Sequence, residues 1–150
     1  TIPVSELGPV LRRIGELAEG YGLRVANVFH AGDGNMHPLI LFDANVAGEL
    51  EKAEALGADI LRLCVEVGGC LTGEHGVDVE KRDLMGVQFA PEDMEAQCRV
   101  KDVFDPKWLL NPAKVFPLHV TAGRARSGPE PARCWRPGAC RASPFTSRGR

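Results

Sequence analysis

The sequence predicts an α+β fold, in which a small antiparallel or mixed sheet is covered by helices. Three segments show apolar residues at helical spacing, and two short apolar runs, residues 23–29 and 38–42, lie between the first and the second of them. The runs contain β-branched residues typical of strands and are joined by a loop that reverses the chain. Helices that precede and follow such a pair of strands cover the sheet. In an α/β fold, by contrast, helices would alternate with parallel strands.

The length of 150 residues suits one domain, which is large enough to bury an apolar core without disulfides or a structural metal. The five cysteines show neither CxxC nor zinc-finger spacing, and Cys64 and Cys98 fall on apolar helix faces, where we expect core residues. Neither a signal peptide nor a run of about 18 apolar residues is present. We therefore expect a cytoplasmic protein without a membrane span.

The first two helices are predicted from apolar periodicity and from their end signals. The first has Ser5 as a cap and ends at Gly20 to Gly22. Its apolar face consists of Leu7, Val10, Leu11, Ile14 and Leu17. The second is the longest, with a cap at Asn45 and an end after Val67, at Gly68 and Gly69.

The rest of the folded chain is predicted from local signals. Residues 70–82, CLTGEHGVDVEKR, predict a short strand that runs into a glycine-flanked loop. A third helix begins at Pro91, which suits a first helical position with acidic residues behind it, and ends before Asp105-Pro106. Residues 108–117 then form irregular chain held by prolines.

Charge and composition both change near Leu118. Residues 1–118 hold 11 Lys and Arg against 19 Asp and Glu, whereas residues 119–150 hold 7 Arg against one Glu, with four prolines and almost no apolar periodicity. We expect a folded domain over residues 1–118 and a disordered basic tail over residues 119–150. The dispersed arginines follow no nucleic-acid-binding motif, so we expect no nucleic-acid partner.

The loop between the two predicted strands, in VFHAGDGNMHPLILF, carries two histidines. His37 stands where a GxGxxG motif has its last glycine, and a strand follows, so the loop is not predicted to bind a dinucleotide. His30 ends one strand and His37 begins the next, which brings both imidazoles to the same end of the sheet. Imidazole suits zinc and other borderline divalent metals, and the pair therefore predicts a metal site.

A third ligand would complete such a site and leave positions open for a substrate. Glu74 and His75 are the candidates, because glycines on both sides let the backbone there adopt unusual conformations. The alternative is that these histidines are turn or core residues. Asp33 belongs to a tight-turn sequence and is predicted to shape the turn or to orient an imidazole. Glu80 to Arg82 are predicted to form a solvated face.

Three segments resemble a known family. VANVFHAGDGNMHPLILFDAN, GEHGVDVEKR and FDPKWLLNPAKVFP are similar to the C-terminal part of FAD-linked oxidases of the vanillyl-alcohol oxidase type, and the resemblance extends over residues 1–117. It implies a ferredoxin-like half of a substrate domain, with an antiparallel sheet covered by helices, packed on a flavin domain located N-terminal to it. It also implies FAD as a cofactor.

The resemblance further implies a role for each candidate residue. His30, His37 and Glu74 match the ligands of a divalent metal, either zinc or manganese, and His75 matches the residue that acts on the substrate as a general base. Asn111 matches an asparagine that lies near the flavin ring, although a turn before a proline explains it equally well.

The implied reaction is oxidation of a small 2-hydroxy acid, with glycolate converted to glyoxylate and hydride passed to FAD. The implied partners are a second flavin-binding subunit and an iron-sulfur subunit, through which the protein would associate with a membrane. D-Lactate and D-2-hydroxyglutarate are alternative substrates. Another alternative is a non-catalytic metal-binding or assembly module, because these 150 residues do not include a separate flavin domain.

Three positions depart from the family pattern. The family has glycine where Asp78 and Ala113 stand, and we expect strain at turns that require a positive φ. The most similar family member has a basic residue where Val4 stands, and valine cannot make the contact to an anion that a basic residue would offer there.

Overall fold

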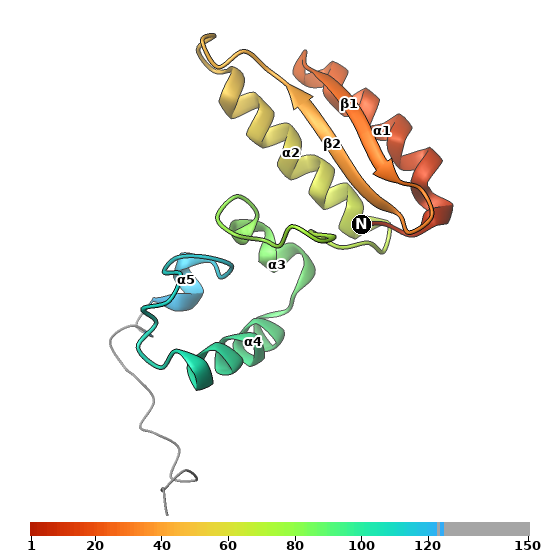
Figure 1. The fold of residues 1–150 in the computed structure, drawn as a ribbon. Coiled ribbons are helices and arrows are strands. Elements are labelled where there is room, and N and C mark those ends of the chain that lie inside the picture. The colour runs from red at the N-terminus through yellow and green to blue at the C-terminus, as the bar shows by residue number, and fades with distance from the viewer. Residues whose placement is uncertain (123, 125–150) are drawn as a thin grey trace, which may run out of the picture.

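The computed structural model describes residues 1–122 and 124 and has the predicted α+β architecture (Figure 1). Its helices and strands follow in the order η1 (Val4–Glu6), α1 (Leu7–Tyr21), β1 (Arg24–His30), β2 (Asn35–Leu41), α2 (Glu49–Glu66), η2 (Arg82–Leu84), α3 (Met85–Gln88), α4 (Pro91–Phe104) and α5 (Leu118–Thr121). In Figure 1, α1 and α2 flank the two strands, while α3, α4 and α5 form a second group below them.

The sheet is an antiparallel hairpin of β1 and β2, as predicted. Val25 pairs with Ile40, and Phe29 pairs with Met36. Val25, Met36 and Ile40 pack against the core that α1 and α2 build. Because side chains alternate along a strand, the residues between them point to the opposite face, away from this core.

The main core lies between α1, α2 and the inner face of the hairpin. Ile14 and Leu56 are fully buried, and each such side chain contributes about 1.5–3 kcal/mol through its removal from water. The other buried helix residues of this core are Val10, Ala18, Ala53, Ile60, Leu63 and Cys64. Cys64 and Cys98 are both buried, as predicted, and burial raises the pKa of each thiol.

The predicted N-terminal caps of the first two helices are wrong. Ser5 lies inside η1, and α1 has no side-chain cap. Helix α2 begins only at Glu49, after Gly48 at φ +85°. Asn45 instead belongs to a turn, because the Asp43 carboxylate accepts hydrogen bonds from the backbone N–H and the side-chain amide of Asn45.

The strand predicted after Cys70 is also wrong, because residues 70–80 are irregular. The N–H of Cys70 donates to the carbonyl of Thr1 at 2.9 Å, and the N–H of Leu71 donates to the Gln88 side chain at 2.8 Å. These partners come from separate segments and do not form a ladder. Helix α4 starts at Pro91 and ends before Asp105, as predicted.

The positive φ angles expected at Asp78 and Ala113 are confirmed, at +48° and +60°. This conformation costs a residue with a Cβ about 1–2 kcal/mol. Contacts between the chain around Asp78 and the chain after Ala113 hold this backbone conformation in place. The Val115 N–H donates to the Asp78 carbonyl at 2.9 Å, and Lys114 Nζ lies 2.9 Å from the Asp78 carboxylate. Arg82 also donates to the Ala113 carbonyl at 2.8 Å.

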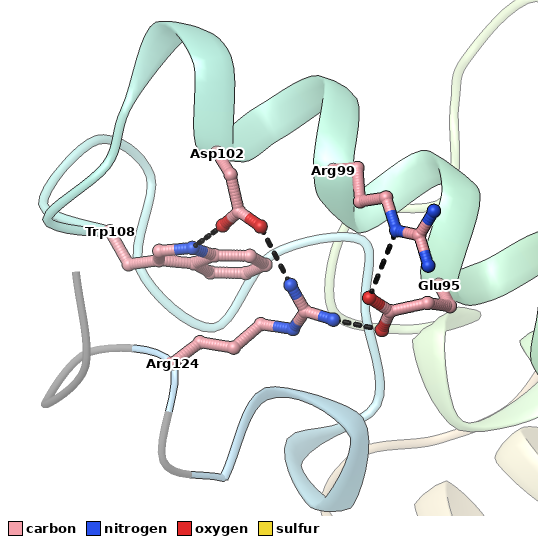
Figure 2. Close-up of polar contacts among 5 residues, drawn as sticks. All are labelled: Glu95, Arg99, Asp102, Trp108 and Arg124. Atoms are coloured by element: carbon pink, nitrogen blue, oxygen red, sulfur yellow. Dashed lines mark hydrogen bonds and ion pairs between the residues drawn. The ribbon is translucent and has the colours of Figure 1, made fainter. Parts of the chain in front are cut away.

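The last described residues fold back on α4 (Figure 2). The Arg124 guanidinium donates to Asp102 at 2.7 Å and to Glu95, and it lies 5.8 Å from the ring centroid of Trp108. The Trp108 indole N–H also donates to Asp102, at 2.6 Å. Helix α5 thus crosses the expected boundary between the folded domain and the tail, which lies after Leu118. The remainder of the predicted disordered tail lies outside the described residues.

Arg124→Gln should lower the free energy of unfolding at neutral pH more than Arg99→Gln, whose side chain is 74% exposed and pairs with the same carboxylate. The hydrogen bond from Arg124 lowers the pKa of Glu95 from its ordinary value of 4.5. This contribution is therefore fully present above pH 4.5 and is lost as the pH falls through the lowered pKa of Glu95.

Urea unfolding near pH 7 and at about pH 3 measures the effect. The stability difference between the parent protein and Arg124→Gln should shrink at the lower pH. An equal difference at both values would contradict the ion-pair explanation.

Candidate functional site

The strand register places His30 and His37 on the outward face of the hairpin. His37 lies opposite Val28, and His30 lies opposite Asn35. Val28 and His30 are two residues apart on β1, so all of these side chains point to one face. The two imidazole centroids are 5.5 Å apart and their planes meet at 83°.

The turn between the strands is built by Asp33 and Gly34. The backbone N–H groups of both residues donate to the His30 carbonyl, at 3.2 and 3.1 Å. The Asp33 carboxylate accepts a hydrogen bond from the Asn35 N–H at 3.2 Å, and Gly34 has φ +70°. Asp33 therefore has the turn-forming role predicted for it, and this turn fixes where each histidine leaves the sheet.

Glu74 reaches the two histidines from the irregular segment after α2. Its Oε1 atom lies 3.3 Å from His37 Nε2 and 3.5 Å from His75 Nε2. One ligand atom each from His30, His37 and Glu74 lies within 4.8 Å of the other two. His75 adjoins this cluster, with its ring centroid 5.2 Å from that of His37.

The chemistry of this donor set fits a divalent metal ion. Zinc binds imidazole nitrogen and carboxylate oxygen at about 2.0–2.2 Å, so the ligand atoms around one ion lie within roughly 4.4 Å of one another. Small side-chain rotations would bring the three residues into that range. Three protein ligands leave coordination positions open, as in catalytic sites. Of the two candidates for the third ligand, the geometry favours Glu74.

The His75 side chain is 71% exposed, whereas that of His37 is 23% exposed. Apolar side chains extend from the cluster along the same outward face of the sheet. Val28, Leu39 and Leu41 are 56%, 51% and 46% exposed. The cluster therefore lies at the end of an open, largely apolar surface. A hollow along α1, lined by Arg13, Glu16, Leu17, Gly20 and Tyr21, contains none of the cluster residues.

Asn111 is exposed and lies in the segment after α4, at φ +46°. Its carbonyl accepts a hydrogen bond from the Lys114 N–H at 3.4 Å. The prediction that Glu80 to Arg82 form a solvated face is wrong for Arg82, whose side chain is only 17% exposed. Among residues 1–122 and 124, no helix combines the length and hydropathy needed to cross a membrane.

Sequence reasoning missed the contribution of Thr1 and Ile2, which lie against both the hairpin turn and the segment that carries Glu74. The Ile2 N–H donates to the Gly34 carbonyl at 3.0 Å, and the Thr1 carbonyl accepts from Cys70. Neither residue type has a local signal for this position. The contacts are between backbone groups far apart in the sequence, which periodicity and motif spacing do not reveal.

The fold and the cluster define an α+β domain with a candidate divalent-metal site on the open face of a hairpin. The chain belongs to the family described as FAD linked oxidases, C-terminal domain, whose family model matches residues 1–115. The resemblance of the three sequence segments to that family is thereby confirmed.

Several curated proteins are similar to the chain. It is 58% identical over 120 residues to the protein named glycolate oxidase subunit GlcD of Escherichia coli K12, a match that covers 79% of this chain and 24% of that protein. It is 36% identical over 116 residues to the Bacillus subtilis protein of the same name, covering 77% and 25%. It is 31% identical over 119 residues to a mitochondrial D-lactate dehydrogenase [cytochrome] of Arabidopsis thaliana, covering 79% and 21%. The chain thus spans about a quarter of the length of these relatives.

Proposed function

We propose that this chain is the substrate-domain part of a flavin-dependent 2-hydroxy-acid dehydrogenase that oxidises glycolate to glyoxylate. The observation that carries the proposal is the convergence of ligand atoms from His30, His37 and Glu74 within 4.8 Å. Membership of the FAD-linked oxidase family supports FAD as the cofactor. The names of the relatives from E. coli and B. subtilis support glycolate as the substrate.

His30, His37 and Glu74 would hold a zinc or manganese ion. When bound there, the ion would neutralise the carboxylate of the 2-hydroxy acid and lower the pKa of its hydroxyl group, and FAD, when bound, would accept the hydride from the carbinol carbon. The proposed role of this chain is to orient the acid at the open face of the hairpin and to remove its hydroxyl proton.

His75 is the residue that we assign to proton removal. It adjoins the proposed ligands, and its exposed imidazole is free to approach a substrate on the outward face. Asn111 is proposed to lie near the flavin, a role for which its exposed position on an irregular segment leaves room.

The subunit names of the relatives support assembly with further chains, for which we propose a second flavin-binding subunit and an iron-sulfur subunit. We propose the cytoplasm as the location, with any membrane association made through those subunits. D-Lactate is the second candidate substrate, because other relatives are named D-lactate dehydrogenase. The ratio of kcat/KM for glycolate and D-lactate decides between the two acids.

His37→Ala should weaken binding of Zn²⁺ or Co²⁺ to this chain by about 100-fold or more, because one of three protein ligands is lost. Isothermal titration measures the affinity. His119→Ala is the matched control, since His119 is exposed on α5 and lies outside the cluster. Equal affinity in the parent protein and in His37→Ala would refute the assignment of His37 as a ligand.

His75→Gln should lower kcat for glycolate by roughly 10²- to 10⁴-fold, the usual contribution of a general base. The reaction is measured in a chimera in which residues 1–118 of this chain replace the matching segment of the E. coli relative. Metal content should stay at the parent level, because His75 is not assigned as a ligand. A variant that retains full turnover, or that loses its metal, would show that the role is wrongly assigned.

A further inference from the structure

Residues Thr1 and Ile2, called here the N-terminal brace, connect the two parts of the proposed metal site. On one side, the Ile2 N–H donates to the carbonyl of Gly34 in the hairpin turn at 3.0 Å. On the other side, the Thr1 carbonyl accepts from the Cys70 N–H at 2.9 Å, four residues before Glu74. Ile2 is 3% exposed and packs in the core with α1 and α2, so the brace is anchored.

Glycines allow the brace to approach its neighbours more closely than side chains permit. A Cβ atom on Gly34 would lie 2.0 Å from the Ile2 carbonyl oxygen, and one on Gly69 would lie 2.2 Å from the Thr1 carbonyl oxygen. A Cβ atom on Gly73 would lie 2.6 Å from Thr1 Oγ1. Gly34 in the hairpin turn and the two glycines that precede Glu74, which are far from it in the sequence, thus each lie against Thr1 or Ile2.

Gly73 also contacts the hairpin directly. A Cβ atom there would lie 2.3 Å from Asn35 Oδ1, and Asn35 pairs with His30 in the strand register. Gly73 immediately precedes Glu74. The contact between Asn35 and Gly73 therefore joins the strand that carries His37 to the segment that carries the carboxylate.

The ion pairs of Glu74 are too weak to fix its position. Its side chain is 56% exposed, and water screens ion pairs in such a setting so that they contribute little. The hydrogen bond from Cys70 to Thr1 and the close approach of Gly69 and Gly73 to the brace constrain the segment more strongly. The packing of the backbone of residues 69–73 against the brace thus sets the position of the Glu74 carboxylate.

We propose that Ile2, Gly69 and Gly73, together with the backbone of Thr1, are positioning residues that hold Glu74 within ligand range of His30 and His37. This inference rests on the proposed function only in treating the cluster as a metal centre. The packing of the brace itself is independent of any metal.

Gly73→Ala tests the proposal, and Gly32→Ala is its matched control. Gly32 lies in the hairpin turn, does not have a positive φ, and has open space within 4 Å of the place that a Cβ atom would occupy. Gly73→Ala should weaken Co²⁺ binding by at least about tenfold, the range for groups that orient metal ligands. It should also speed amide hydrogen exchange at Ile2 and Cys70, measured without metal. Gly32→Ala should change neither.

A rescue variant separates positioning from loss of the fold. Combining Gly73→Ala with Asn35→Ala and Thr1→Ala removes the side-chain atoms nearest to the new methyl group. Co²⁺ binding and slow exchange should return toward the parent values, even if Gly73→Ala alone fails to fold.

The proposed role of the brace would be overturned if Gly73→Ala kept the amide exchange rates and the Co²⁺ affinity of the parent protein. It would also be overturned if the triple variant recovered neither property. Failure of the parent protein to bind Co²⁺ would instead refute the proposed metal site, and the exchange rates would still decide whether the brace holds residues 69–73.

Discussion

The register of the β1–β2 hairpin is the constraint on which the candidate site depends. Val25, Met36 and Ile40 are held on the inner face by the apolar core, and the alternation of side chains then places His30 and His37 together on the outer face. A slip by one residue would turn His37 into the core and Ile40 out of it. The hydrophobic effect thus orients two polar side chains that contribute little to the core themselves.

The third member of the cluster depends on non-local backbone packing. Glu74 lies on a segment without regular secondary structure, in which the N–H groups of Cys70 and Leu71 donate to Thr1 and to the Gln88 side chain. Glycine at position 73 lets that segment approach Asn35 and Thr1 closely. The hairpin and an irregular segment are therefore combined into one cluster beside the exposed outer face.

The sequence predicted the features that depend on local patterns. Apolar periodicity indicated the extents of α1 and α4 and most of α2, and glycine-flanked polar residues between apolar runs pointed to His30, His37 and Glu74. The resemblance to a family that has glycine at both positions also predicted the positive φ at Asp78 and Ala113. Features that depend on distant contacts were missed. Asn45 is held in a turn by Asp43, Arg82 is covered by the segment at Ala113, and Arg124 pairs with Glu95 and Asp102 on α4.

X-ray absorption spectroscopy of the zinc-loaded chain tests the central claim most directly, because it reports the atoms bound to the ion. The spectrum should show two imidazole nitrogens and one carboxylate oxygen at about 2.0–2.2 Å, with water in the remaining positions. In Glu74→Gln the carboxylate contribution should disappear while the imidazole signals remain. A parent spectrum with fewer than two imidazoles, or one that Glu74→Gln leaves unchanged, would contradict a site shared by the hairpin and the segment after α2.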